Sequence, residues 1–257
     1  MKRKLYAERP GWGKDFDYDE ARHLVAYRYA HELVRGKDVM DAGCGEGFAT
    51  QTLTETARSV VGVDYHAEAV ATAKRKSSHP KLSFRVVDLT AAVADDTFDV
   101  VLNFQVLEHV IDDAAFVRRL HGWLRPGGTL MLTTPNVVQS FSENPCHLRE
   151  YHAGELEALL RPVFSEVKLL GVFGNDRVRE FDRNRRRAVE RILELDPLGL
   201  RRLLPERLLH AIFARLGQLV RRLAHRHVGE TPLRIEDFRI GEGDLAEAVD
   251  LVAICRR

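Results

Sequence analysis

Short apolar runs alternate along the chain with longer segments in which apolar residues recur every three or four positions. The short runs predict strands at about 38–42, 60–63, 82–87, 98–102, 128–134, 164–173 and 248–255. The periodic segments predict helices at about 19–34, 47–57, 67–76, 112–123 and 154–161. Because strands and helices alternate, we expect an α/β fold with βαβ units around a mostly parallel sheet.

The pattern changes in two parts of the chain. Residues 1–18 contain helix-breaking proline and glycine and are expected to form an N-terminal arm. Residues 19–174 and 236–257 carry the alternating pattern and are expected to form one domain. Residues 175–235 are an arginine-rich insertion before the last strand, with amphipathic helices expected near 182–195 and 205–226. We expect this insertion to be a lid, a substrate element or a dimer element.

Composition and charge narrow the class of protein. The chain has 257 residues, of which 45% are hydrophobic and 30% are charged, as in an ordinary globular protein. The net charge of +1 provides no overall field for nucleic acid, so no nucleic-acid partner is expected. Cys44, Cys146 and Cys255 are too dispersed for a disulfide framework or a zinc site, which favours a cytoplasmic location. No segment approaches the roughly 20 apolar residues of a spanning helix, and the charged N-terminus predicts no signal peptide.

A glycine-rich turn follows the first predicted strand. Asp41 ends the strand, and Gly43, Gly45 and Gly47 alternate behind it. Glycine lets the backbone approach a ligand closely, and the helix start that follows presents N–H groups to it. The dinucleotide fingerprint GxGxxG would need a third glycine where this chain has Phe48, so the spacing disfavours a dinucleotide.

Polar residues also end the next three predicted strands. Asp64, Asp88 and Asn103 follow the second, third and fourth strands, as Asp41 ends the first. The carboxyl ends of parallel strands share one edge of a sheet, where open α/β sheets bind their ligands. We therefore expect these side chains to converge on one ligand.

The same residues belong to longer motifs. The segment DAGCGEG at 41–47 resembles the first motif of class I S-adenosylmethionine-dependent methyltransferases. NFQVLEHV at 103–110 and LRPGG at 124–128 are similar to the segments of that family after strand four and before strand five. The resemblance covers about residues 20–175. It implies S-adenosylmethionine as cofactor and a Rossmann-like, seven-stranded, mostly parallel sheet in the order 3-2-1-4-5-7-6.

A narrower resemblance concerns the acceptor side. TTPN at 133–136, NPCHLREY at 144–151 and RHLVAYRYA at 22–30 are similar to a branch of the family often associated with glycan methylation. Cys146 departs from that branch, which more often has a bulkier residue there. The two resemblances imply which residues contact the amino-acid tail, the ribose and the adenine of the cofactor. They are His23, Tyr27, Asp41, Gly43, Gly45, Gly47, Asp64, Tyr65, Asp88, Leu89, Asn103 and Phe104.

Transfer of a methyl group to a hydroxyl is assisted by a general base, a task that suits histidine. His147, on the loop after the fifth predicted strand, is the first candidate. His109, which follows Glu108 in the chain, is the second. No metal-ligand spacing stands out, so no metal is expected. Glu108, His109 and His147 are the residues that could contribute if a divalent ion were used.

The leading interpretation is an O-methyltransferase that acts on a hydroxyl of a sugar or glycan by base-assisted in-line displacement. Asn136, Arg149 and Tyr151 are expected to contact this acceptor. Two alternatives stay open: a small-molecule methyltransferase acting on a quinone precursor or natural product, and a catalytically silent cofactor-binding interaction protein. A nicotinamide-dependent oxidoreductase is disfavoured by Phe48.

The insertion leaves the partners open. Fourteen arginines and eight acidic residues lie between Asn175 and Glu230. Such a surface suits solvent, an anionic substrate, a membrane surface or a second protomer. We expect a small-molecule or glycan acceptor, while a peripheral membrane contact and a homodimer through the insertion stay open.

Overall fold

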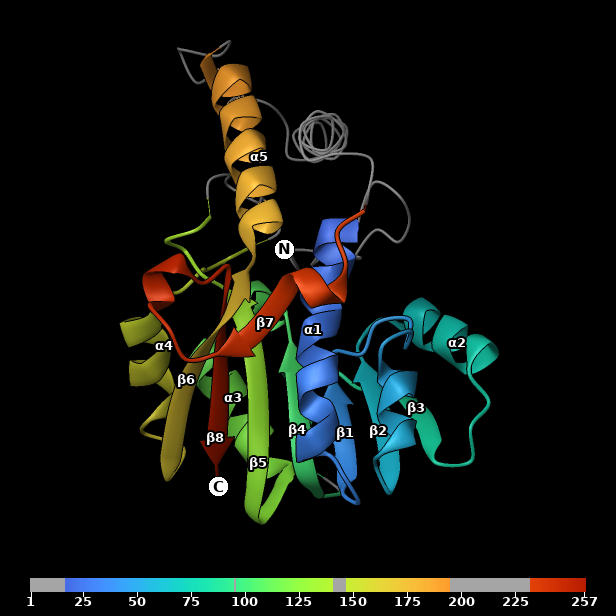
Figure 1. Ribbon diagram of the computed structural model, residues 1–257. Coiled ribbons are helices and arrows are strands. Elements are labelled where there is room, and N and C mark those ends of the chain that lie inside the picture. The colour runs from blue at the N-terminus through green and yellow to red at the C-terminus, as the bar shows by residue number, and fades with distance from the viewer. Residues whose placement is uncertain (1–16, 95, 141–146, 195–231) are drawn as a thin grey trace, which may run out of the picture.

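The computed structural model of the protein describes residues 17–94, 96–140, 147–194 and 232–257 (Figure 1). In these residues one sheet contains eight strands in the order β3-β2-β1-β4-β5-β8-β6-β7. The strands are β1 Asp38–Ala42, β2 Ser59–Asp64, β3 Leu82–Val86, β4 Phe98–Phe104, β5 Leu124–Pro135, β6 Glu166–Gly174, β7 Phe238–Gly241 and β8 Asp250–Arg256.

The sheet is parallel from β3 to β5 and antiparallel beyond it. β1 pairs with β2 on one side and with β4 on the other, and both pairs are parallel. The pairs of β2 with β3 and of β4 with β5 are also parallel. β8 runs antiparallel between β5 and β6, and β7 pairs antiparallel with β6. The α/β fold and the order of the seven expected strands are thus confirmed, and β7 is an additional edge strand that the sequence pattern did not predict.

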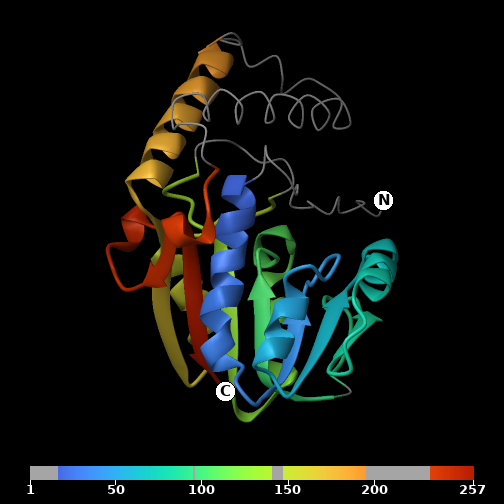
Figure 2. The same ribbon diagram turned by 45° about the vertical axis from the view of Figure 1, so that its right-hand side comes forward.

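Helices cover both faces of this sheet (Figures 1 and 2). α1 and α2 lie on one face, α3 and α4 lie on the other, and α5 extends past the carboxyl edge of the parallel strands. The helices are α1 Asp17–Leu33, α2 Ala67–Lys76, α3 Asp113–Gly122, α4 Ala153–Leu160 and α5 Asp176–Glu194, with short 3-10 helices η1 Thr50–Glu55, η2 Leu107–His109, η4 Ile235–Asp237 and η5 Leu245–Glu247.

The core consists of two main apolar layers, one on each side of the sheet. Alternate residues of a strand point to opposite faces. Val39 and Val100 accordingly pack in the cluster with α1, whereas their neighbours Met40 and Val101 pack in the cluster with α3 and α4. The central strands are buried on both faces, which fixes the carboxyl ends of β1, β4 and β5 relative to one another.

Two local predictions differ from the structure. The helix expected over 47–57 is the shorter 3-10 helix η1. The hydroxyls of Thr52 and Thr54 donate to carbonyl oxygens three residues earlier, and bonds of this kind compete with a regular α-helix. The LRPGG segment, expected to precede the fifth strand at about 128–134, is continuous with β5, and the pairing with β4 is irregular between Phe98 and Val100.

The beginning of the insertion is the helix α5, which starts earlier than the helix expected near 182–195. Tyr18 of α1 stacks on Phe181 with ring centroids 4.9 Å apart, and its hydroxyl donates to Asp182 at 3.0 Å. Arg177 pairs with Asp237 at 3.0 Å. Residues 1–16, most of the expected N-terminal arm, and the helix expected near 205–226 lie outside the described residues. The division into arm, domain and insertion stays a prediction.

Candidate active site

The glycine turn lies at the carboxyl end of β1, and two of its glycines have no room for a side chain. Gly43, Gly45 and Gly47 have φ angles of +98°, +54° and +74°, which favour glycine. A Cβ on Gly43 would lie 2.4 Å from Val106, and one on Gly47 would lie 2.6 Å from the ring of Phe84. Protein side chains thus pack against Gly43 and Gly47, whereas a Cβ on Gly45 would meet nothing within 4 Å, so a ligand can approach the turn closely at Gly45.

The Asp64 carboxylate joins the turns after β1 and β2. One oxygen accepts a hydrogen bond from the Gly45 N–H at 3.0 Å, and the other accepts from the His66 N–H at 2.8 Å. Asp64 is half-buried, whereas the Tyr65 ring next to it is 45% exposed. This arrangement orients the carboxylate at the edge of the turn, and its remaining lone pairs can accept from a hydroxyl-bearing ligand.

Asp88 and Leu89 follow β3 at the same carboxyl edge of the sheet as the glycine turn. Asp88 is exposed, and its Oδ1 accepts from the backbone N–H of Thr90 at 2.9 Å and from the Thr90 hydroxyl at 2.6 Å. Leu89 is buried in the core layer that contains α3 and α4. Asp88 is thus free of the core and presents a carboxylate at the rim, while Leu89 anchors the loop.

Asn103 occupies the carboxyl end of β4, fully buried beside the turn. Its Nδ2 donates to the backbone oxygen of Ala42 at 2.7 Å. Its Oδ1 has no hydrogen-bond partner among the described residues. A buried acceptor without a donor is costly, so Asn103 Oδ1 and the bare glycine turn fit a ligand that brings an N–H or O–H group, such as the ammonium of S-adenosylmethionine.

Three expected cofactor residues lie beneath the turn. Asp41 is buried, and both the Tyr27 hydroxyl at 3.0 Å and the Thr50 hydroxyl at 2.6 Å donate to its Oδ2. Burial raises the pKa of Asp41 to about 6. Phe104 is buried edge-on against Tyr27 with ring centroids 4.9 Å apart. These contacts indicate that Asp41 orders the turn, and Phe104 and Tyr27 support the turn from within the core.

His23 lies one helical turn before Tyr27 on α1, with the two ring centroids 5.3 Å apart. It is half-buried, and its burial together with the neighbouring Arg22 charge lowers its pKa to about 4. The imidazole is therefore neutral at pH 7.

The structure gathers the three residues that were considered for catalysis. η2 places Glu108 and His109 directly after β4, and the loop after β5 brings His147 to them. The ring centroids of His109 and His147 are 5.1 Å apart, and His109 Nε2 lies 4.0 Å from Glu108 Oε1. One ligand atom from each of the three side chains lies within 4.8 Å of the others. Glu108 is 1% exposed, and burial raises its pKa to about 7.

Two residues that support this cluster were not expected from the sequence. Glu150 Oε1 lies 2.5 Å from His147 Nδ1, and the Thr134 hydroxyl donates to Glu108 Oε2 at 3.2 Å. The spacing of three between His147 and Glu150 was a weak signal in the sequence. Nothing local in the sequence connects Thr134 with Glu108, because β5 meets η2 only in the folded sheet.

A second group of side chains that the sequence did not predict joins α1 to β8. Arg22 donates two hydrogen bonds of 2.6 Å to the carboxylate of buried Asp250 and a third of 3.1 Å to Gln105 Oε1. Gln105 has a φ of +56°, unusual for a residue other than glycine. Strained residues of this kind gather at functional sites. Gln105 follows Asn103 and Phe104, so its place just beyond a strand end was the available signal.

The residues expected to contact the acceptor divide into buried and exposed members. Asn136 is buried, and its Nδ2 donates to the backbone oxygens of Leu245 and Ala248, both at 2.7 Å. Tyr151 is also buried, and its hydroxyl donates to Asp113 at 2.9 Å. Both side chains hold the loops beyond β5, and we do not propose them as acceptor contacts. Cys146 lies outside the described residues.

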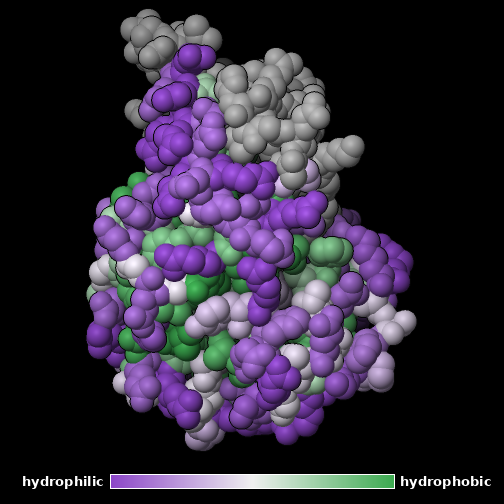
Figure 3. Space-filling model, viewed as in Figure 1, coloured by the Kyte–Doolittle hydropathy of each residue, from purple (hydrophilic) through white to green (hydrophobic). Residues whose placement is uncertain are grey.

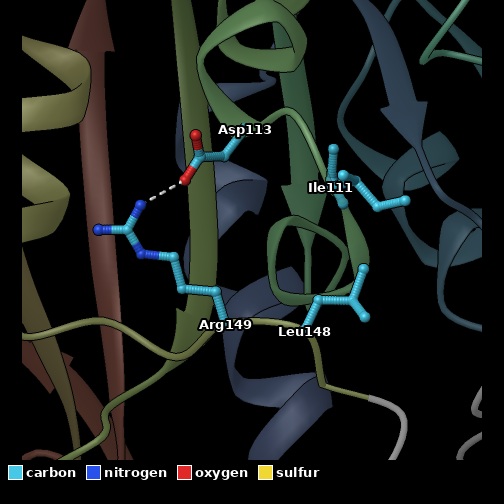
Figure 4. A pocket seen from close by; sticks show the side chains of 5 residues that line it. Ile111, Asp113, Leu148 and Arg149 are labelled. Carbon is cyan, nitrogen blue, oxygen red and sulfur yellow. Dashed lines mark hydrogen bonds and ion pairs between the residues drawn. The ribbon is translucent and has the colours of Figure 1, made fainter.

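Arg149 lines an open pocket of about 410 Å³ next to the cluster (Figure 4). Its Nη1 donates to Asp113 at 2.8 Å across the pocket wall. Ile111 and Leu148 form an apolar side of the pocket, and these residues are 76% and 41% exposed, respectively. The N–H of Leu148 donates to the backbone oxygen of Glu108 at 2.8 Å, so this wall of the pocket is joined to the backbone of η2.

Comparisons with known proteins agree on a family. A family described as "Methyltransferase domain" matches residues 40–132. The chain is 38% identical over 181 residues to a probable S-adenosylmethionine-dependent methyltransferase of Mycolicibacterium smegmatis, and the match covers 67% of this chain and 69% of the relative. It is 34% identical over 131 residues to the mitochondrial ubiquinone biosynthesis O-methyltransferase of Bos taurus, which covers 48% of this chain and 35% of that relative.

Among solved structures, an S-adenosylmethionine-dependent methyltransferase from Mesorhizobium loti has a TM-score of 0.56 at 17% identity, covering 93% of this chain and 100% of that chain. At this identity the likeness concerns the fold alone. In the part of the chain that the structure describes, no helix has the length and apolar character needed to cross a membrane.

Proposed function

The chain belongs to the class I S-adenosylmethionine-dependent methyltransferases, and we propose that it transfers the methyl group to a hydroxyl oxygen of a small molecule. The observation that carries this proposal is the cluster of Glu108, His109 and His147 at the carboxyl ends of β4 and β5. Glu108 and His109 follow β4, the strand that contains Asn103, and β4 pairs with β1, which leads into the glycine turn, so cofactor and acceptor would meet between them.

The comparisons favour a small-molecule acceptor over a glycan. The ubiquinone biosynthesis O-methyltransferase is similar to almost half of this chain, and it acts on oxygen according to its name. The glycan acceptor expected from the narrower resemblance has no support in the comparisons. The apolar wall formed by Ile111 and Leu148 also suits an aromatic or alkyl-bearing molecule better than a sugar.

The proposed cofactor contacts follow from the geometry of the strand ends. Asp64 would accept from the ribose diol and Asp88 from the adenine amine, because each presents a carboxylate at the rim. Asn103 Oδ1 would accept from the ammonium group of the tail. The turn at Gly43 and Gly45 would lie against the cofactor. When bound, the cofactor supplies an electrophilic methyl group on its sulfonium.

Removal of the proton from the acceptor's hydroxyl is the task left to the protein. The pKa of Glu150 lies below its ordinary value through its contact with His147 and through hydrogen bonding to Ser140, although burial opposes this shift. An ionised carboxylate only accepts, so the proton of the neutral His147 ring resides on Nδ1 and its basic nitrogen is Nε2. His147 can then take the hydroxyl proton as the new O–C bond forms and the S–C bond breaks. A positioned base of this kind contributes about 10²–10⁴-fold.

The insertion is proposed as a cover for the acceptor side. α5 rises from the end of β6 past the carboxyl edge, and hydrophilic side chains cover its visible surface (Figures 1 and 3). Its base is fixed through Phe181 and Tyr18 and through the pair of Arg177 with Asp237. A dimer contact or a peripheral membrane contact through the same helix would be revealed by sedimentation and by vesicle binding.

Cofactor binding and methyl transfer test the proposal separately. Calorimetry should give heat with S-adenosylmethionine and S-adenosylhomocysteine but none with nicotinamide dinucleotides. Mass spectrometry should then detect methylated product from a panel of catechols and hydroxyquinone precursors and none from nucleotide sugars. Methylation of the sugars alone would overturn the acceptor class, and absence of heat with either cofactor form would overturn the site.

His147→Gln is the variant that tests the proposed base. It should lower turnover at least 100-fold with an unchanged affinity for S-adenosylhomocysteine. His79→Ala is a matched control, because His79 is an exposed histidine in the turn before β3 and should leave turnover unchanged. Wild-type turnover in His147→Gln would exclude His147 as the base.

A further inference from the structure

We infer that Gln105 is a specificity-determining residue, whose carboxamide donates a hydrogen bond to a second oxygen of the acceptor, next to the hydroxyl that is methylated. The acceptor would accordingly carry two neighbouring oxygens. This inference rests on the proposed function, because it needs a hydroxyl acceptor beside His147. It is carried by the way in which the backbone and the side chain of Gln105 are held directly after β4.

The backbone of Gln105 has a conformation that is costly for its residue type. In the part of the chain that the structure describes, Gln105 is the one residue other than glycine with a positive φ, +56°. Its N–H donates to the backbone oxygen of Thr133 at 3.0 Å, and the next residue, Val106, packs against Gly43 of the glycine turn. Strained residues persist only where their surroundings determine them. Gln105 is therefore held between the glycine turn and β5.

The neighbours of the Gln105 side chain fix the orientation of its carboxamide. Arg22 Nη2 donates to Gln105 Oε1 at 3.1 Å, and Arg22 is itself bound to buried Asp250 by two hydrogen bonds of 2.6 Å. A guanidinium group only donates, so the carboxamide oxygen faces Arg22 and the NH₂ group faces away from it. One N–H lies at the long distance of 3.4 Å from Thr133 Oγ1. The other N–H has no partner among the described residues, and Gln105 is half-buried, so a ligand can reach it.

Gln105 and the proposed base approach the acceptor from opposite faces of the sheet. Thr133 and Thr134 are consecutive residues of β5, so their side chains point to opposite faces. The Thr133 hydroxyl faces Gln105, whereas the Thr134 hydroxyl donates to Glu108 Oε2 at 3.2 Å. An acceptor at the end of β5 would thus meet the carboxamide from one face and His147, which lies beside Glu108, from the other.

Two polar groups on opposite faces match two oxygens of one acceptor. The hydroxyl that reacts gives its proton to His147 and takes the methyl group from the sulfonium. The neighbouring oxygen keeps any proton of its own and accepts from Gln105 Nε2. A donor that is fixed in advance loses little freedom on binding. An acceptor without the second oxygen would cover this N–H and leave it unpaired, which is the basis for rejecting such a molecule.

The charges around Gln105 favour a neutral oxygen over a carboxylate. The Arg22 charge is balanced by Asp250, with which it forms an ion pair of 2.6 Å, so the carboxamide is an uncharged donor beside a neutral pair. Burial raises the pKa of Glu108 to about 7, and the negative charge of Asp250 adds to this rise. A carboxylate on the acceptor would add a further negative charge next to these two acids. A hydroxyl or a carbonyl oxygen is therefore the expected partner of Gln105.

Acceptors that differ in one hydroxyl test this role by binding alone. The full chain, saturated with S-adenosylhomocysteine, is titrated in a calorimeter with 4-butylcatechol, 3-butylphenol and 4-butylphenol, each phenol lacking one hydroxyl of the catechol. We expect the wild type to bind the catechol at least about 10-fold more tightly than the better of the two phenols. Gln105→Met keeps the length of the side chain but has no donor, and it should reduce this ratio to about threefold or less.

Gln51→Met is the matched control, because Gln51 is exposed on η1 and accepts from the Ser77 hydroxyl at 3.0 Å. It should keep the wild-type ratio. The affinity for S-adenosylhomocysteine should stay within about threefold in both variants, which reports folding and the cofactor site. Gln105→Leu, which also lacks a donor, repeats the test if Gln105→Met does not bind S-adenosylhomocysteine.

The ratio of affinities separates specificity from a structural role of Gln105. If Gln105 only supported Arg22, its loss would weaken the binding of catechol and phenols alike, and an unchanged ratio in Gln105→Met would overturn the inference. A wild type that binds catechol no better than the phenols, or binds none of the three, would also overturn it. Tight and Gln105-dependent catechol binding without methyl transfer from S-adenosylmethionine would count against the proposed function and support the role of Gln105.

Discussion

Replacement of Gly43 by alanine should destabilise the protein for two reasons that can be measured separately. Its φ of +98° strains any residue with a Cβ, by about 1–3 kcal/mol. The added Cβ would also lie 2.4 Å from Val106 Cγ2, and overpacking of this kind costs about 1–3 kcal/mol. We therefore expect Gly43→Ala to lower the free energy of unfolding by about 2–6 kcal/mol in the absence of cofactor.

Gly45→Ala is the matched control within the same turn. Its φ is +54°, but an added Cβ would meet nothing within 4 Å. Only backbone strain remains, so the expected loss is about 1–2 kcal/mol. The comparison isolates the steric part of the Gly43 effect from the conformational part that both glycines share.

Urea unfolding followed by circular dichroism measures these free energies by linear extrapolation. Val106→Ala should remove the clash, so Gly43→Ala should cost less in the Val106→Ala background by about 1–3 kcal/mol. The double variant also keeps the test possible if Gly43→Ala alone fails to fold. Equal losses for the Gly43 and Gly45 variants, or no recovery with Val106→Ala, would refute the reasoning.

Three other substitutions probe the support beneath the site. Burial raises the pKa of Asp41 to about 6, so the folded state holds its proton more tightly than the unfolded chain does, and this contribution to stability is present at low pH and lost as pH rises through 6. When the pH is lowered from 7.5 to 4, the free energy of unfolding of the wild type, measured with urea, should therefore rise by up to about 3 kcal/mol relative to that of Asp41→Asn. The same dependence of this free energy on pH in both proteins would contradict the prediction. Glu150→Gln should lower turnover about 10-fold because His147 loses the contact that orients its ring, while the affinity for S-adenosylhomocysteine measured by calorimetry stays unchanged. Arg22→Met should lower the unfolding free energy by about 3–5 kcal/mol because it leaves Asp250 buried without its partner, and a loss below 1 kcal/mol would show that the pair is dispensable.

The sequence by itself determined the frame of the protein and the position of the cofactor site. Strands alternate with helical segments in the pattern of apolar residues, and this alternation leaves few arrangements other than a parallel sheet. The glycines after β1 and the polar residues after β2, β3 and β4 then had to share one edge. Asp64 and Asn103 do lie at that edge, because the inference depends only on strand direction and on turns of a few residues.

The same local rules could not say which polar side chains remain accessible. Asn136 and Tyr151 look like acceptor contacts in the sequence, yet both are buried and hold loops together. Asp41 is covered by Tyr27 and Thr50, which come from α1 and η1. Burial of a single side chain depends on what packs over it, and the covering residues are distant in the chain.

Only the tertiary structure decided how the catalytic candidates are combined. Glu108 and His147 are separated by almost forty residues, and they meet because β4 and β5 are adjacent and their loops turn toward each other. Glu150 completes the cluster from the loop of His147 and Thr134 from β5, and Arg22 of α1 reaches Asp250 of β8 across most of the chain. Hydrogen bonds and ion pairs need their atoms within about 3–4 Å, a condition that sequence spacing does not encode and that the packing of strands, helices and loops sets.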